Sequence, residues 1–184
     1  MAETVEPGYI RSGSYELTRP SDTTAYAAGD AIANSDTAAS VVPMEFEVTK
    51  DANGGTGLII GARLLTNSAT AFGAMRLHLF NRAPFAAAGY QADNSALALT
   101  YTALVDGEAA GTNPNDNYIG SVDFTTFVAH SSSARSIGTC DQTELEFRTK
   151  PGSNKIYGLL EARAAITPAS AQTFNAILSV RGIS

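Results

Sequence analysis

Hydrophobic and polar residues alternate along much of this chain with a period of two residues, which is the side-chain period of a β-strand. In one stretch Met44, Phe46 and Val48 share one face. The glutamates between them, Glu45 and Glu47, share the other. Similar alternation recurs in residues 9–17, 74–80, 143–149 and 172–182, and residues 155–165 are expected to form another strand. Turn residues separate these stretches, so the pattern predicts about eight to ten strands and almost no helix.

This spacing of strands and turns is typical of an all-β domain. We predict an antiparallel β-sandwich with jelly-roll connections, and an immunoglobulin-like sandwich is the alternative. Residues 51–55 have the turn chemistry of a hairpin loop. The last three strands, joined by short turns, should form a meander on one edge. Asp93 and Asn94 could cap a short helical turn.

A chain of 184 residues is long enough for one domain with a filled core. Residues 1–8 end in Pro7-Gly8 and are expected to form an extended N-terminal arm, which leaves residues 9–184 as a single β-sandwich domain. The arm lacks the apolar run of a secretory signal, and no stretch approaches the roughly 18 apolar residues of a membrane span. The single cysteine, Cys140, cannot form a disulfide within the chain. We therefore expect synthesis in a reducing cytoplasm and no membrane partner.

The formal charge of −6 argues against nucleic acid as a partner, because binding to phosphates requires clustered cations. Charged residues make up only 16% of the chain, whereas they make up about a quarter of a typical soluble domain. Nine of the twelve cations are arginine, the residue type enriched at protein interfaces. The codon composition of a GC-rich genome would explain the excess of arginine over lysine equally well. The low charge density fits a surface partly covered by other subunits.

The two histidines do not stand in a catalytic pattern. His78 falls on the outward face of an alternating strand, where a surface or interlayer imidazole is expected. His130 precedes Ser131-Ser132-Ser133, but neighbours in one loop rarely align a nucleophile, a base and a third group that orients the base. The glutamate pairs at 45/47 and 144/146 alternate on solvent faces instead of facing each other across a cleft. We predict that the protein is not an enzyme.

Patterns for metals and cofactors are also missing. One cysteine and two scattered histidines cannot make a zinc cluster. The oxygen-rich loop at residues 113–117 lacks the acidic spacing and the distal glutamate of a calcium loop, and turn chemistry explains its composition. A weak calcium site in this loop is the alternative. No Gly-rich loop opens a helix to cradle a phosphate. We expect no metal and no cofactor.

One stretch, residues 19–33, has the chemistry of a corner where a short strand folds onto a sheet. Pro20 fixes φ and withholds an N–H, so the segment begins as a turn. Tyr26 offers an aromatic anchor, and Gly29 permits a positive φ. Asp30 then leads into a small apolar strand at Ile32.

The corner pattern Arg-Pro-x-Asp-Thr-Thr-x-Tyr-x-x-Gly-Asp-x-Ile, from Arg19 to Ile32, resembles the opening of a family of tailed-bacteriophage virion proteins. The similarity continues in order at residues 77–81, 93–96, 118–124, 156–162 and 167–170, so it spans most of the chain. Members of this family look like capsid decoration, or cement, proteins, which are generally β-sandwiches that lie on the shell.

The resemblance implies a structural virion protein that stabilises a bacteriophage capsid by bridging neighbouring major capsid protein subunits. It implies a location on the capsid surface and self-association as a homotrimer, with a dimer as the alternative. A carbohydrate- or receptor-binding β-sandwich module of a phage particle is the second interpretation. The resemblance supplies no active site. The candidates for contact with the shell are Tyr9, Arg11, Arg19, Tyr26 and Asp30.

Overall fold

The computed structural model describes residues 9–68, 72–83, 92–97, 99, 117–130 and 135–182. The predicted N-terminal arm at residues 1–8 lies outside these ranges, as do the serines that follow His130. Of the oxygen-rich loop, only Asn117 is described. The expectations for the N-terminal arm, for the serines after His130 and for the oxygen-rich loop therefore stay predictions.

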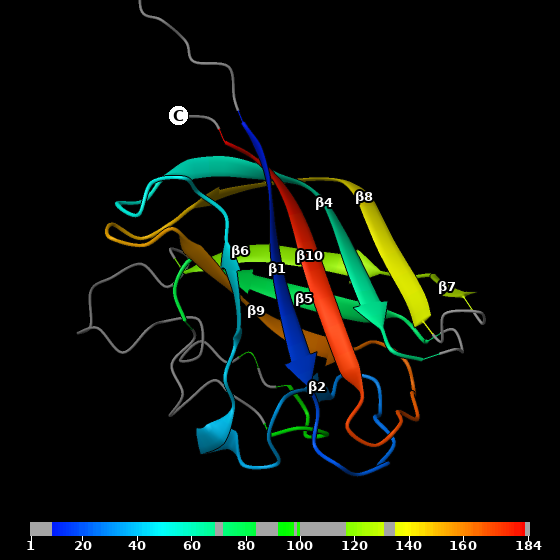
Figure 1. Ribbon diagram of the computed structural model, residues 1–184. Helices are drawn as coiled ribbons and strands as arrows, with labels where there is room; N and C mark the ends of the chain where they lie inside the picture. Colours follow the sequence, from blue (N-terminus) through cyan, green and yellow to red (C-terminus); the bar gives the residue numbers. More distant parts are fainter. Residues whose placement is uncertain are drawn as a thin grey trace, which may run out of the picture.

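Two antiparallel sheets face each other across one core (Figure 1). The first sheet has the order β1-β10-β4-β8-β7. Its strands are β1 (Ile10–Thr18), β4 (Thr56–Thr66), β7 (Phe127–His130), β8 (Arg135–Arg148) and β10 (Thr173–Gly182). In the second sheet β9 is flanked on one side by β2 and β3 and on the other by β5 and then β6. Its strands are β2 (Ala31–Ile32), β3 (Met44–Glu47), β5 (Met75–Phe80), β6 (Tyr118–Phe124) and β9 (Lys155–Ala162).

The prediction of an all-β antiparallel sandwich is confirmed. Among the described residues the helical content is one short 3-10 turn, Ala38–Ser40. The helical turn expected after Asp93 and Asn94 is not formed, because Ala96 instead makes an isolated bridge with Asp30. No helix in the described part of the chain is long and apolar enough to cross a membrane.

The strand pairs are nested, as if one long hairpin had been rolled up. The first strand pairs with the last, β3 with β9, β4 with β8 and β5 with β6. Rolling then brings β10 beside β4 and β9 beside β5. The expected meander of the last three strands is wrong, because β9 lies in the other sheet and β4 separates β8 from β10. The expected hairpin at residues 51–55 is also wrong, since this loop carries the chain from one sheet to the other.

The main core lies between the sheets and follows the alternation of the sequence. Met44, Phe46 and Val48 are all buried, as predicted. The strand at the C-terminal end of the fold behaves likewise, with Phe174, Ala176, Leu178 and Val180 fully buried. Close packing of these side chains removes apolar surface from water, which is the main stabilising contribution to the fold.

A smaller apolar cluster covers the outer face of the second sheet. Phe80 and Leu159 are buried there together with Ala33 and Val41. Leu97, Leu99, Tyr118 and Tyr157 pack against them. His78, on the outward side of β5, is only 6% exposed and lies opposite Leu159 of this cluster in the pairing of β5 with β9. Of the two expected positions for this imidazole, at the surface or between layers, the exposed one is not observed.

Candidate functional site

The corner at residues 19–33 is held by a buried cluster of three polar side chains. Arg19 donates from Nε to the Tyr26 hydroxyl at 2.8 Å and from Nη2 to Asp93 Oδ2 at 3.0 Å. The Tyr26 hydroxyl in turn donates to Asp93 Oδ1 at 2.7 Å. Asp93 also accepts the backbone N–H of Ala33 at 2.8 Å. Every oxygen of this carboxylate is thus used, as a buried charge requires.

Burial and charge act in opposite directions on the protonation of this cluster. Burial by itself would lower the pKa of Arg19, but the hydrogen bonds to Tyr26 and Asp22 raise it above its usual value. Burial, aided by the neighbouring Asp93 carboxylate, raises the pKa of Tyr26, which keeps the phenol protonated as the donor. Burial also raises the pKa of Asp93, and the donors on its two oxygens oppose that rise. The cluster is an ion pair with a phenol wedged into it.

The backbone of the corner is fixed to the end of β9. Tyr26 makes an isolated bridge with Ile166, and the N–H of Gly29 donates to the carbonyl of Ala162 at 2.7 Å. Gly29 has φ of 97°, the positive value expected from its sequence context. Asp30 accepts the N–H of Ala27 at 2.6 Å through Oδ2, which closes the turn before β2. The predicted docking of a short strand at this corner is confirmed.

Three carboxylates of the described residues approach one another beside this cluster. Single oxygens of Asp22, Asp36 and Asp93 lie within 4.8 Å of each other. Two of the three already contact one cation, because Arg19 Nη2 lies 2.9 Å from Asp22 Oδ1 and 3.0 Å from Asp93 Oδ2. The guanidinium therefore provides the compensating charge that a metal ion would otherwise have to bring.

A second polar network lies on the outer face of the second sheet. His78 Nε2 is 2.9 Å from Glu161 Oε2, and His78 Nδ1 is 3.1 Å from the Tyr118 hydroxyl. Arg163 donates to the other oxygen of Glu161 at 3.0 Å. Since Glu161 can only accept, the network assigns the proton of a neutral imidazole to Nε2, and Tyr118 donates to Nδ1.

This network resembles part of a catalytic triad, but its second nitrogen does not face a nucleophile. Burial lowers the pKa of His78, although the Glu161 hydrogen bond opposes this. Burial also raises the pKa of Tyr118, which makes the phenol a poor nucleophile at neutral pH. The arrangement orients side chains across three strands, β6, β5 and β9. We assign it a structural role.

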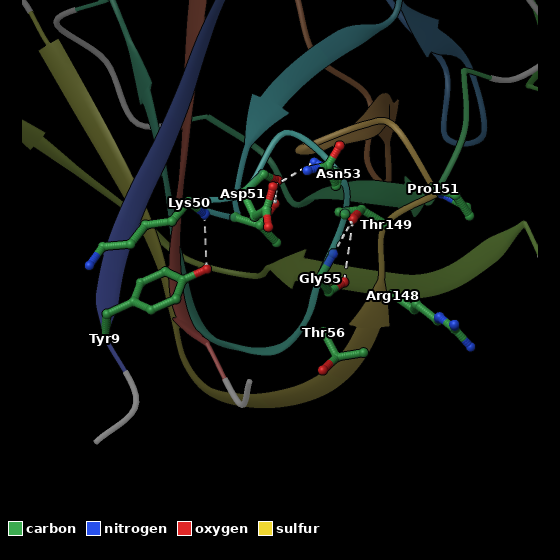
Figure 2. A pocket seen from close by; sticks show the side chains of 11 residues that line it. Tyr9, Lys50, Asp51, Asn53, Gly55, Thr56, Arg148, Thr149 and Pro151 are labelled. Carbon is green, nitrogen blue, oxygen red and sulfur yellow. Dashed lines mark hydrogen bonds between the residues drawn. The ribbon is translucent and has the colours of Figure 1, made fainter. Parts of the chain in front are cut away.

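A surface depression lies at the other end of the sandwich, where Tyr9 precedes β1 (Figure 2). It measures about 570 Å³, and its walls are mainly the loops at residues 49–56 and 148–151. The Tyr9 hydroxyl accepts the N–H of Lys50 at 3.1 Å, and Asp51 Oδ1 accepts the N–H of Asn53 at 2.8 Å. The N–H of Gly55 also donates to the Thr149 hydroxyl at 2.8 Å, so several polar groups of the lining are hydrogen-bonded to one another.

The five predicted contact residues do not form one patch. Tyr9 precedes β1 and Arg11 lies near its start, where Arg11 pairs with Glu47 at 3.1 Å. Arg19 follows the end of the same strand, roughly 30 Å away at the usual rise per residue. Arg19 is 2% exposed and Tyr26 1% exposed. Both side chains are hydrogen-bonded inside the corner, so neither presents an exposed surface in the isolated chain, and a contact of either with a partner stays a prediction.

Asp30 and the two β1 residues remain partly exposed and available at the surface. Asp93 is predicted from the sequence as a possible helix cap, but not as a partner of Arg19, to which it bonds across 74 residues. Its neighbour Asn94 has φ of 59°, so the pair forms a turn instead of a helix cap. No local signal in the sequence identifies Asp93 as the partner of Arg19.

Comparison of the chain with family models, with curated proteins and with solved structures found no match.

Proposed function

We propose that this protein is a structural component of a tailed-bacteriophage virion that decorates the capsid and stabilises it by bridging major capsid protein subunits. We also infer that the sandwich has jelly-roll connections. In an immunoglobulin-like sandwich the first strand lies beside the second along the chain. Here β1 lies beside β10, and the nested pairs are those of a rolled double hairpin.

One observation carries the proposal. The separate segments that resemble phage virion proteins come together in space. Residues 77–81, 118–124 and 156–162 are the neighbouring strands β5, β6 and β9, with Asn81 just beyond β5. Residues 93–96 supply Asp93 to the corner, and residues 167–170 supply the carbonyl of Ala169 to Arg19. Segments of a chance similarity have no reason to gather in one half of a molecule, so this gathering supports a shared fold.

The proposed role uses contact area instead of chemistry. The two polar networks of the described residues are closed on themselves, and the core between the sheets is filled. Covering apolar surface contributes roughly 25 cal/mol per Å², partly offset by ordering costs. Many weak contacts on one shell act together through avidity. The protein is accordingly proposed to be non-enzymatic, to self-associate and to lie on the capsid surface.

A sugar-binding role is less well supported by the same surface. Such sites use exposed aromatic faces, and the chain contains no tryptophan. The ring of Tyr9 lies against Gly182, where an added Cβ would come within 2.4 Å of it. Lys50 Nζ lies 5.2 Å from the centre of the same ring. The aromatic group at the depression is thus already used within the chain.

The test is to mix the purified protein with phage heads that lack it and to sediment the particles. We expect saturable binding at a fixed number of copies per head and greater resistance of the heads to heat. Charge reversal at one end of the sandwich, Lys50→Glu, is compared with Ala28→Arg at the corner. The proposal sets one end of the sandwich against the shell, so one of these two variants should lose binding. Arg63→Glu, on an exposed position of β4, is the matched control and should bind normally.

Failure of the unmodified protein to bind heads, together with binding to glycans, would overturn the decoration role.

A further inference from the structure

β1 is an edge strand of the first sheet, and no strand pairs with it on its free side. β3 packs close to it without pairing, with the Glu47 carbonyl near Gly13. The N–H of Gly182 donates to the carbonyl of Tyr9, and the N–H of Arg19 donates to the carbonyl of Gln172. These bonds show that the odd-numbered residues of β1 face β10. In an antiparallel pair the intervening residues then direct their backbone groups away from the partner. Among the described residues, β10 is the only strand that pairs with β1, so no ladder uses those groups of Ser12 and Ser14.

The other edges of the two sheets are less suited to pairing. β3 has four residues and follows Pro43, and β7 also has four residues. β6 has a break in register opposite Leu79 and Phe80. β1 instead keeps an unbroken register with β10 over nine residues. Its centre, Ser12-Gly13-Ser14, lacks the lysine, proline or bulge with which edge strands are usually protected.

The space beside this edge is open and locally neutral. A groove of about 370 Å³ runs along the centre of β1 and is walled on the far side by Glu45, Glu47 and Lys155. Lys155 pairs with Glu45 at 2.6 Å, and Arg11 pairs with Glu47 at 3.1 Å. The groove therefore carries two cations and two carboxylates, although the whole chain has a charge of −6. A second copy of the same surface meets no net repulsion there.

We propose that β1 pairs with β1 of a second copy, antiparallel, about a two-fold axis at Gly13. This register sets Ser12 opposite Ser14 of the second copy, and Ile10 opposite Glu16. The residues that pair are then the even-numbered ones, whose backbone groups are free. Gly13 meets itself at a position without hydrogen bonds, where the two backbones approach most closely. Gly13 is buried on the inward face of its own chain, where an added Cβ would lie 2.9 Å from the Glu47 carbonyl.

Charge and exposure agree with this register. Ile10 is 72% exposed, and its neighbour on the other side is Arg181 of β10. Pairing would place Glu16 of the second copy on the same face, two strands from Arg181, about 10 Å away. The two-fold axis repeats this arrangement at the other end of the interface. The first sheets of the two copies would join into one continuous sheet.

The inference is independent of the decoration role, because it concerns the purified protein without any shell. Light scattering over a range of concentrations should show a mass rising to twice the 19.1 kDa of the chain. Amide hydrogen exchange at Ser12 and Ser14 should slow as the concentration rises. The amides of Arg11 and Tyr15, which face β10, should not change.

Two double variants test the register. Ser12→Lys with Ser14→Lys places lysines opposite each other twice and should raise the dissociation constant of the dimer by roughly tenfold or more. Ser12→Lys with Ser14→Glu places each lysine opposite a glutamate and should leave a dimer. Both positions are exposed, so folding is retained. A monomer or trimer at every concentration would overturn the proposal, as would equal dimerisation of the two variants.

Discussion

Replacing Asp93 by asparagine tests how the corner is held. The substitution preserves the size of the side chain but removes its charge. One of its two oxygens becomes an amide nitrogen, which cannot accept the hydrogen bond from Arg19 or from Tyr26. The guanidinium of Arg19, whose side chain has no exposed surface, then keeps only Asp22 as a charged partner.

The expected loss of stability follows from the burial of both charges. Breaking a buried ion pair by removing one partner costs about 3–5 kcal/mol, because it leaves the other charge uncompensated. Because Asp22 still contacts Arg19 in the variant, we expect a loss at the lower end of this range for Asp93→Asn, about 3 kcal/mol. In a domain of this size such a loss lowers the melting midpoint by about 6–12 °C.

The assay is chemical denaturation followed by tyrosine fluorescence, with the slope checked for two-state behaviour. Asp22→Asn is the matched control, since both carboxylates contact the same guanidinium nitrogen but Asp22 is 36% exposed. It should have a much smaller effect. Replacing Arg19 and Asp93 together by apolar residues should recover part of the stability lost by Asp93→Asn. A loss below about 1 kcal/mol for Asp93→Asn would refute the claim that this pair anchors the corner.

Three further changes have defined outcomes. Burial lowers the pKa of His78 in the folded protein, so below about pH 6.5 the unfolded chain binds a proton more readily and stability falls. His78→Gln should make this fall smaller, which melting midpoints at pH 7.5 and 5.5 measure. Gly29→Ala should cost about 1 kcal/mol from its positive φ alone, since the methyl group meets nothing within 4 Å. Gly13→Ala should cost more in the same denaturation assay, because its methyl group meets the backbone carbonyl of Glu47.

The strands themselves are predictable from sequence because alternation records which face is buried. Met44 and Phe46 are buried on β3 and Val48 just beyond it, and the alternating residues of β10 are buried likewise. The positive φ of Gly29 is likewise a local property. These features depend on residues within a few positions of each other, so local patterns report them faithfully.

The pairing of strands is not local, and the sequence does not reveal it. The loop at residues 51–55 has hairpin chemistry, yet it connects the two sheets, because β3 finds its partner in β9 more than a hundred residues away. Phe80 and His78 lie on the outward face of β5, yet both are buried. The residues that cover Phe80 come from other parts of the chain, so the alternation within β5 does not predict its burial. From the sequence, Arg19 and Tyr26 are candidates for surface contacts, but in the fold both form hydrogen bonds with the distant Asp93.

The most direct test of the account is a cryo-electron microscopy map of the virion that contains this protein. The account predicts density for the sandwich on the outer surface of the shell, at a constant number of copies per lattice unit, bridging major capsid protein subunits. Intact virions from which the protein is absent, or in which it lies away from the capsid, would contradict it.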